Sequence, residues 1–332
     1  MTAATTTERA PLMHAAQTGW RLWNRFWFNP VPASRVGLLR IWLFGFAFFD
    51  VLLRKEVSVA FADTPRLFWH PVGATWLLDQ VGLGPPDAWQ IRTVQVVLAI
   101  TALLAAIGYR YRFAAPVAAV LYLYWQCLGQ SWGEMKHARV TLVLALLFLC
   151  VVRAEQRRSI DSWRRRRRVT LAHPRGELSY PDDEPSRNGA WAIRAIQVAL
   201  AALYFLSGYS KLRAVGIDWI WGDTLRQAIQ DKGSSGETTA LGYFVLRQEW
   251  MLIAFQAVAF TWELFFPLVF IRRLRAPILI VGILFNIGLW TTVKIEFFGV
   301  VACFAAFLPL ERYEQAVRRR LRRSSAASTA TA

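Results

Sequence analysis

The sequence alternates between long apolar blocks and short segments that carry arginine. Hydrophobic residues make up 55% of the 332 residues. A helix needs about 20 mostly apolar residues to cross the hydrocarbon core of a bilayer. The apolar blocks have about that length, so the sequence predicts an all-α protein, a multispanning bundle of transmembrane helices embedded in the lipid bilayer.

We expect about eight spans in this bundle, the first of them a retained anchor rather than a cleaved signal peptide. Their approximate bounds are 36–53, 91–109, 113–132, 137–152, 190–210, 250–271, 276–293 and 297–310.

The segments outside the spans differ in composition and in the structure they predict. Residues 1–19 are rich in Thr and Ala, which predicts a disordered tail. Trp20 to Phe28 mixes aromatic residues with arginine, as a helix lying in the membrane interface does. We expect a short helix near Thr75–Gln80 and an amphipathic one around Leu225–Ile229. Residues 20–312 then form one membrane domain, followed by a basic tail, 313–332.

The formal net charge of +17 comes mostly from arginine, including the run Arg164–Arg168. In a soluble protein this would suggest nucleic acid, but beside apolar spans it indicates cytoplasmic loops near anionic lipid. With both termini in the cytoplasm, every inner segment carries arginine and the outer ones carry little. We therefore expect a multi-pass protein of a cell membrane, of the bacterial cytoplasmic type, with no nucleic-acid partner.

This topology collects several ionisable residues on the outer face. They are Lys136, His137, Lys211 with its loop, and the segment Lys294–Glu296. Ionisable groups within the spans are costly and are functional candidates by default. Asp50 is expected to pair with Arg54 four residues later, and Arg40 to extend to the interface.

Three other polar side chains lie within the spans, those of Gln197, Glu263 and Asn286. Glu263 lies deep in its span and needs a partner or a proton. Gln197 and Asn286 fit interhelical hydrogen bonds. The three cysteines lack the spacing of a metal site or a disulfide framework, and the sequence has no Gly-rich phosphate loop or Ser-His-Asp set.

Lys211 admits two interpretations. A lysine at the end of an apolar span is commonly an interfacial anchor. Held in an apolar pocket, the same side chain has a lowered pKa and can act as a general base. His137 taken alone is an interfacial histidine for which a structural role is expected.

Three stretches resemble the HTTM domain family, the membrane proteins related to vitamin K-dependent gamma-carboxylase. The strongest is YFLSGYSKL, ending at Leu212 and followed by Trp219-Ile220-Trp221-Gly222. A second begins at His137 and runs through an apolar span to Ser159-Ile160-Asp161. The first span, with Leu39-Arg40-Ile41 and Asp50, is a weaker match.

The resemblance implies a helix bundle whose active site opens to the non-cytoplasmic side. In the carboxylase, a lysine deprotonates a reduced vitamin K-type quinone, and the resulting strong base leads to carboxylation of a substrate glutamate and formation of a quinone epoxide. That lysine matches Lys211, and the assisting histidine matches His137. The resemblance thus implies catalytic roles for these two residues and a quinone as cofactor.

The chain also departs from the carboxylase. It ends soon after the last span, without a large soluble substrate-binding domain, and Ser210-Lys211 stands where the carboxylase has two lysines. One hypothesis is a quinol-dependent carboxylase- or epoxidase-like enzyme that modifies an exported peptide. A second is a non-enzymatic accessory or maturation factor for an exported peptide or a membrane partner. A transporter is less well supported, because the sequence has no inverted repeat.

Overall fold

A computed structural model describes residues 9–53, 59–133, 137–172, 184–234, 236 and 238–330. For residues 9–16, 59–60, 137, 172 and 321–330 it describes the backbone alone. Throughout the described ranges the chain is helical and forms no strand beyond one isolated bridge between Val31 and Ser186. The predicted all-α class is confirmed.

Five helical segments are long and apolar enough to cross a membrane. They are α2 (Ala33–Leu53), α4 (Ala88–Ile107), α8 (Arg187–Val215, with η5 continuing to Trp221), α11 (Glu249–Phe265, with η6 continuing to Phe270) and α12 (Arg275–Val293).

The other three predicted spans also coincide with helices. They are α5 (Tyr111–Gln130), the shorter α6 (Val140–Cys150), and α13 (Phe298–Cys303) continued by η7 (Phe304–Phe307). A multispanning helical bundle is thus established, while the number of crossings stays a prediction.

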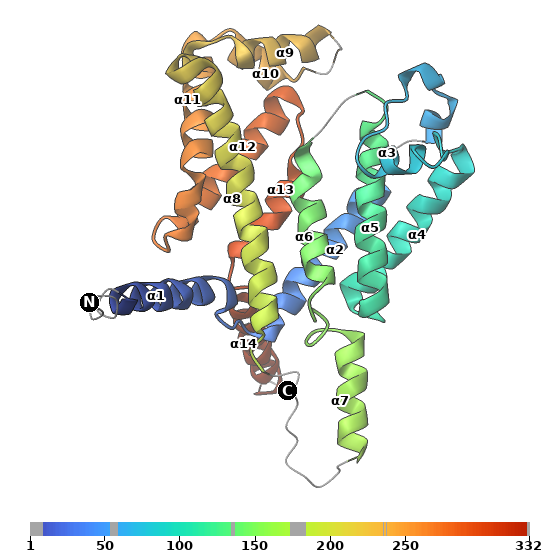
Figure 1. Ribbon diagram of the computed structural model, residues 1–332, viewed down its shortest axis with the longest axis vertical. Helices are drawn as coiled ribbons and strands as arrows, with labels where there is room; N and C mark the ends of the chain where they lie inside the picture. The colour runs from blue at the N-terminus through green and yellow to red at the C-terminus, as the bar shows by residue number, and fades with distance from the viewer. Residues whose placement is uncertain are drawn as a thin grey trace, which may run out of the picture.

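The remaining helices lie at the two ends of the bundle (Figure 1). We call the end with α3 (Ala74–Asp79), α9 (Thr224–Ser234) and α10 (Ala240–Leu246) the outer end, following the predicted topology. The inner end carries α7 (Ile160–Ala172) and α14 (Leu310–Ala330). The helices expected near Thr75 and Leu225 are confirmed as α3 and α9.

Helix α1 (Arg9–Phe28) runs across the bundle axis near the inner end (Figure 1). This orientation suits the interfacial helix expected at Trp20–Phe28. The helix begins at Arg9 and so reaches into the segment expected to be disordered. Its C-terminal end contacts the bundle through Phe26, whose ring lies 5.7 Å from that of Phe270.

Small residues bring α4 and α5 close together. Their buried positions are rich in alanine: Ala99, Ala102, Ala105 and Ala106 on α4, and Ala114, Ala115, Ala118 and Ala119 on α5. Between helices in lipid, small side chains let the backbones approach and gain van der Waals contact. The α4–α5 turn closes at Gly108, which adopts φ +69° and lies so near Arg40 that a Cβ would clash.

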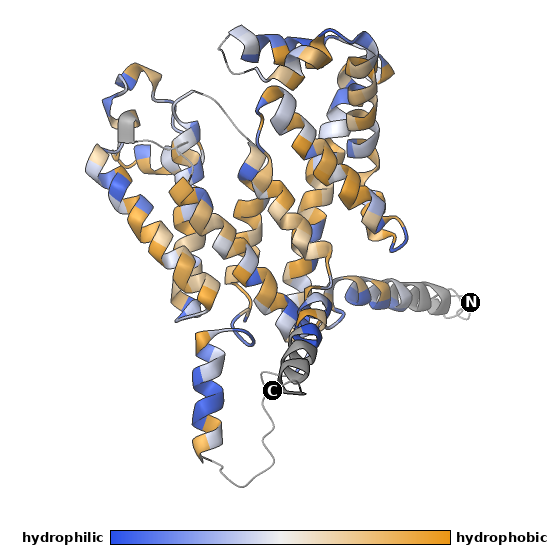
Figure 2. Ribbon diagram, turned by 180° about the vertical axis from the view of Figure 1, so that it is seen from behind, coloured by the Kyte–Doolittle hydropathy of each residue, from blue (hydrophilic) through white to orange (hydrophobic). Residues whose placement is uncertain are grey.

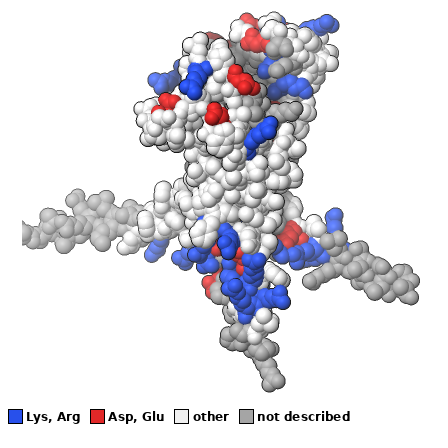
Figure 3. Space-filling model, turned by 90° about the vertical axis from the view of Figure 1, so that its right-hand side faces the viewer, with Lys and Arg blue, Asp and Glu red and all other residues white. Residues whose placement is uncertain are grey.

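Charge and hydropathy divide along the long axis. The middle of the bundle is mostly apolar (Figure 2), and the charged side chains gather towards the two ends (Figure 3). Arginines predicted to be cytoplasmic meet at the inner end, where Arg35 pairs with Glu311 and Arg158 with Glu314, each at 2.5 Å. The fold therefore gathers segments that the charge pattern had assigned to one side.

Candidate functional site

Lys211 and Glu263 meet near the outer end of the bundle. Lys211 lies near the C-terminal end of α8 and Glu263 near that of α11. The two helices approach closely at Gly208, where an added Cβ would lie 2.7 Å from the backbone nitrogen of Leu264. The glycine of the Gly208-Tyr209-Ser210-Lys211 motif thus lets α11 bring a carboxylate to the lysine.

The lysine is enclosed on two sides. Its Nζ is in ion-pair contact with Oε2 of Glu263 and lies 4.7 Å from the centre of the Trp219 ring. Trp219 in turn stacks on Phe260 of α11. The side chain of Lys211 is 22% exposed and that of Glu263 8% exposed. Lys211 is therefore a partly buried ammonium held by a carboxylate and an aromatic face, and Glu263 has the partner that its depth requires.

Gln256 organises the segment that carries Trp219, a role that the sequence did not suggest. Its amide nitrogen donates to the carbonyls of Ile220 and Gly222, each at 2.8 Å, and its oxygen accepts from the backbone N–H of Leu225 at 2.9 Å. The side chain is buried. A signal was present, since Gln256 precedes Glu263 by two helical turns and lies on the same face of α11.

A second contact fixes α9 over the site. Arg226 pairs with Asp223 at 3.0 Å and also with Glu249 at the start of α11. Hydrogen bonds that Arg226 donates to these two carboxylates, the one to Glu249 first, raise the pKa of Arg226. The outer segment is thereby tied to α11 at both Gln256 and Glu249.

Aromatic side chains fill the bundle next to Glu263. Tyr204 of α8 packs on Trp262, with ring centres 4.4 Å apart, and the Trp262 indole donates to the carbonyl of Ile278 at 2.9 Å. Asn286 of α12 donates to Tyr204 Oη at 3.4 Å and to the carbonyl of Gly282. Its role as interhelical glue is confirmed, as is that of Gln197, which donates to the carbonyl of Ala306 at 2.7 Å.

The buried Oδ1 of Asn286 has no hydrogen-bond partner in the described part of the chain. Leaving such an atom without a donor costs about 1–3 kcal/mol. This oxygen is therefore a buried acceptor that a donor from water or a ligand group would satisfy.

His137 is not placed beside Lys211 by the structure. Its backbone begins the 3-10 helix η3 (His137–Arg139) at the start of α6, its side chain lies outside the described atoms, and Lys136 lies outside the described residues. The pairing of His137 with Lys211 therefore stays a prediction.

Asp50 of α2 contacts two residues that are distant in the sequence. It accepts from Arg139 Nε at 3.0 and 3.2 Å and from the Tyr122 hydroxyl at 2.7 Å. Arg54, its expected partner, lies outside the described residues, so that pairing stays a prediction. Asp50 is buried in the bundle, where it joins α2 to η3 and α5.

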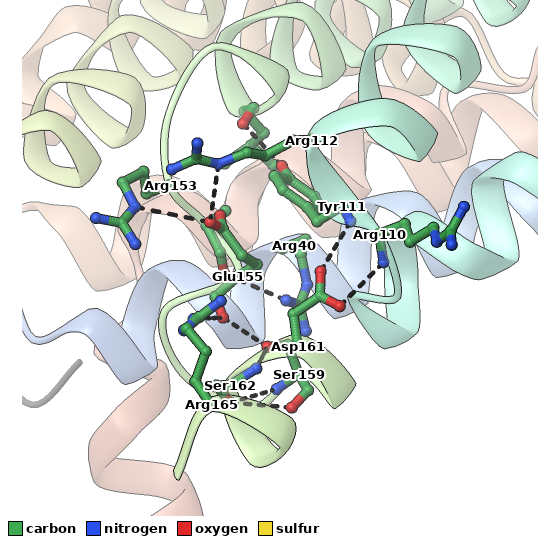
Figure 4. A network of polar contacts seen from close by, with 12 residues as sticks. Arg40, Arg110, Tyr111, Arg112, Arg153, Glu155, Ser159, Asp161, Ser162 and Arg165 are labelled. Atoms are coloured by element: carbon green, nitrogen blue, oxygen red, sulfur yellow. Dashed lines mark hydrogen bonds and ion pairs between the residues drawn. The ribbon is translucent and has the colours of Figure 1, made fainter. Parts of the chain in front are cut away.

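Arg40 does not extend to the interface. It is fully buried and donates to the carbonyls of Ala154 at 3.3 Å and Arg158 at 2.5 Å. These carbonyls belong to the turn after α6 and lie at the inner end, close to Arg40 (Figure 4). A guanidinium with carbonyl acceptors at hand gains more from them than from reaching past the bundle to headgroups.

The Ser159-Ile160-Asp161 motif takes part in the same network of hydrogen bonds. Asp161 accepts the backbone N–H groups of Arg110 at 3.1 Å and Tyr111 at 3.0 Å, so it satisfies the free donors at the start of α5 (Figure 4). Ser159 donates to the carbonyl of Glu155. This motif joins the turn after α6 to the α4–α5 turn and is structural.

Two cavities lie away from this pair, one between α11 and α12 and the other beside α7, and neither is lined by Lys211 or Glu263. Among the described residues, no group of three or more His, Cys, Asp or Glu side chains is arranged to hold a metal ion. The Lys211 site is therefore defined by its ion pair and its aromatic wall.

A family model for the HTTM domain matches residues 28–311. The chain belongs to the HTTM domain family. Searches of curated proteins and of solved structures gave no match. The matched region of this HTTM protein starts at the last residue of α1 and ends at the beginning of α14, so it contains every helix of the bundle.

Proposed function

We propose that this HTTM protein is a membrane enzyme with carboxylase- or epoxidase-like chemistry, and that Lys211 is its base. The observation that carries the proposal is the contact of Lys211 with Glu263 and Trp219 at the end of the bundle predicted to face outward. Membership of the carboxylase-related family supports it, and so does the motif around Lys211. The outer face of a bacterial cytoplasmic membrane is the proposed location.

The residue types at this site fit a reduced vitamin K-type quinone. Such a molecule, when bound, supplies an acidic hydroxyl on a redox-active ring. The half-buried Trp219 offers an aromatic ring beside a planar ligand, and Lys211 offers the nitrogen for a hydrogen bond to a hydroxyl. The unsatisfied Oδ1 of Asn286 marks a further acceptor near Tyr204.

Glu263 decides when Lys211 can act as a base. Its carboxylate lies against Nζ in the ion pair and is the acceptor nearest to the lysine nitrogen that the structure shows. For Nζ to accept a proton, the existing one must first move to Oε2 of Glu263 or leave through the open side of the lysine. We therefore assign Glu263 the role of proton partner, the role that the resemblance would give to His137.

The test compares two outer-end lysines, each resting on a tryptophan ring. Lys211 lies over Trp219 and Lys294 over Trp290, at 4.7 and 4.9 Å. Membranes holding wild type, Lys211→Gln or Lys294→Gln are supplied with reduced vitamin K-type quinone, oxygen, a glutamate-containing peptide and labelled carbon dioxide. We expect epoxide and labelled peptide from wild type and Lys294→Gln, and a loss of about 10²–10⁴-fold in Lys211→Gln. Equal activity of Lys211→Gln, or none in wild type, contradicts the proposal.

The alternative, a non-enzymatic maturation factor, is favoured by a separate observation. The outer segments expose several large apolar side chains: Ile217, Trp221, Leu241, Tyr243, Phe244 and Trp250. Surfaces of this kind mark sites where partners bind. In this case an exported peptide or a membrane protein would bind the outer segments, and the charge on Lys211 would serve the fold.

Co-purification after crosslinking separates the two functions. A maturation factor retains its partner in Lys211→Gln and loses it in Trp221→Ser or Phe244→Ser. An enzyme loses product formation in Lys211→Gln and keeps it in Trp221→Ser and Phe244→Ser. Partner capture that is the same in all three variants excludes the outer segments as the binding surface.

A further inference from the structure

An apolar groove runs between α11 and α12, away from the Lys211 site. It has a volume of about 580 Å³. Its lining includes Val258 and Phe265 of α11, Ile278 and Val281 of α12, and Leu268 and Leu274 near the turn. By helical spacing, Val258 and Phe265 lie on the side of α11 opposite Glu263. The groove therefore extends from mid-bundle to the inner end of these two helices.

Arginines surround the inner end of this groove. Arg272 and Arg273 are exposed in the α11–α12 turn, and the half-buried Arg275 begins α12 and donates to the carbonyl of Val269 at 3.3 Å. Arg194 of α8 lies close enough to Arg275 for their charges to repel. Arg194 is also held by the carbonyl of Phe26 at 3.1 Å, which places the end of α1 beside the cluster.

These four arginines have no counter-ion among the residues that the structure describes. Within the described ranges, no carboxylate lies within ion-pair distance of Arg194, Arg272, Arg273 or Arg275. Their neighbour Arg35 has one, but Glu311 is already bound to it at 2.5 Å. Like charges gathered at the edge of a low-dielectric bundle repel, and an anion from outside the chain would relieve that repulsion.

We infer that the groove binds one anionic phospholipid, with an acyl chain between α11 and α12 and its phosphate on Arg272 and Arg275. The apolar lining requires a hydrocarbon occupant, and the arginines at its inner end require a negative group joined to that occupant. A phospholipid of the inner leaflet supplies both groups, because its phosphate lies at the bilayer surface and its acyl chain lies in the hydrocarbon below. The inference concerns the inner end of the molecule and does not depend on the proposed function.

The experiment uses the full chain in detergent with an equal mixture of phosphatidylglycerol and phosphatidylcholine. Native mass spectrometry counts the lipids retained. Wild type is expected to keep one phosphatidylglycerol in preference to phosphatidylcholine. Arg272→Gln with Arg275→Gln is expected to weaken its binding roughly 30-fold, since each arginine near the surface contributes about 1 kcal/mol.

Three controls make the result decisive. Arg319→Gln with Arg320→Gln removes the same charge from exposed positions on α14 and is expected to retain the lipid. Thr261→Trp fills the groove, leaves the arginines and is expected to release it. Soluble glycerol phosphate is expected not to compete, because it lacks the chain. Equal losses in both arginine pairs, retention in Thr261→Trp, competition by glycerol phosphate, or a native mass showing a second copy over the groove would each overturn the inference.

Discussion

Two ion pairs join helices of the bundle, and they differ in how completely the protein encloses them. The Asp50 and Arg139 side chains are 3% and 4% exposed, and Tyr122 adds a third contact to the carboxylate. The Lys211 side chain is 22% exposed and meets one carboxylate and one ring face. The closed pair has no room for a ligand and serves to fix α2 against η3 and α5. The open pair leaves its nitrogen reachable from one side, as a reactive group must be.

The largest effect is expected where the closed pair is broken. Asp50→Asn leaves the buried Arg139 guanidinium without its carboxylate, which should lower the free energy of unfolding by about 3–5 kcal/mol. Replacing both charges, as Asp50→Leu with Arg139→Met, should restore most of that loss, because neither charge is then buried alone. Reversible unfolding in mixed micelles measures both. If Asp50→Asn is as stable as wild type, the Asp50–Arg139 pair is not closed in the sense that distinguishes it from the Lys211–Glu263 pair.

A smaller loss is expected at the open pair. Glu263→Gln should lower the free energy of unfolding by about 2 kcal/mol, because Lys211 can regain some solvent when its charged partner is lost. Glu249→Gln is the matched control, since Glu249 lies on the same helix and forms an exposed pair with Arg226. That control should cost under about 1 kcal/mol. A loss at Glu263 as large as that at Asp50 would show that the Lys211 pair is closed as well.

Removing the aromatic wall should open the lysine further. Trp219→Leu takes away a ring 4.7 Å from Nζ and should cost about 0.5–1 kcal/mol of stability. It should also speed the labelling of Lys211 by an amine reagent, followed by mass spectrometry. Lys294, which rests on Trp290, provides the internal reference and should be labelled at an unchanged rate. If both lysines respond alike, the effect is not local to the Lys211 site.

The smallest effect is expected from Glu311, outside the spans. Burial alone would raise its pKa, but hydrogen bonds from Arg35 and the backbone and the charge of Arg35 outweigh it, so the pKa lies below the ordinary value. A lowered folded pKa adds stability above the unfolded value, and this stability is lost as the pH falls through the folded one. Wild type should exceed Glu311→Gln by up to about 1 kcal/mol at pH 7. That gap should close as the solution is acidified; a constant gap would contradict the assignment.

The fold was largely predictable from the apolar blocks, because each block reports locally on its own helix. Every predicted span coincides with a helix, and so do the short elements α3 and α9. Arg40 shows where local reasoning fails. Its position near a span end predicts that it extends to the interface, whereas the tertiary fold offers it the carbonyls after α6. Asp50 likewise gains a guanidinium 89 residues away, which its own segment does not reveal.

The candidate site was also predictable only in part from the sequence. The motif ending in Lys211 and the depth of Glu263 were evident separately, but nothing local joins residues 52 positions apart. Gln256 was missed because a single amide in an apolar helix does not reveal that its partners are loop carbonyls. The role of His137 stays a prediction.

The sequence by itself determined that this chain is a helical membrane protein of the HTTM family, because hydropathy acts segment by segment. The tertiary structure alone decided which buried charges neutralise one another. That choice depends on the rotation and spacing of helices, set here by contacts such as Gly208 against Leu264, and such contacts form only when distant segments pack.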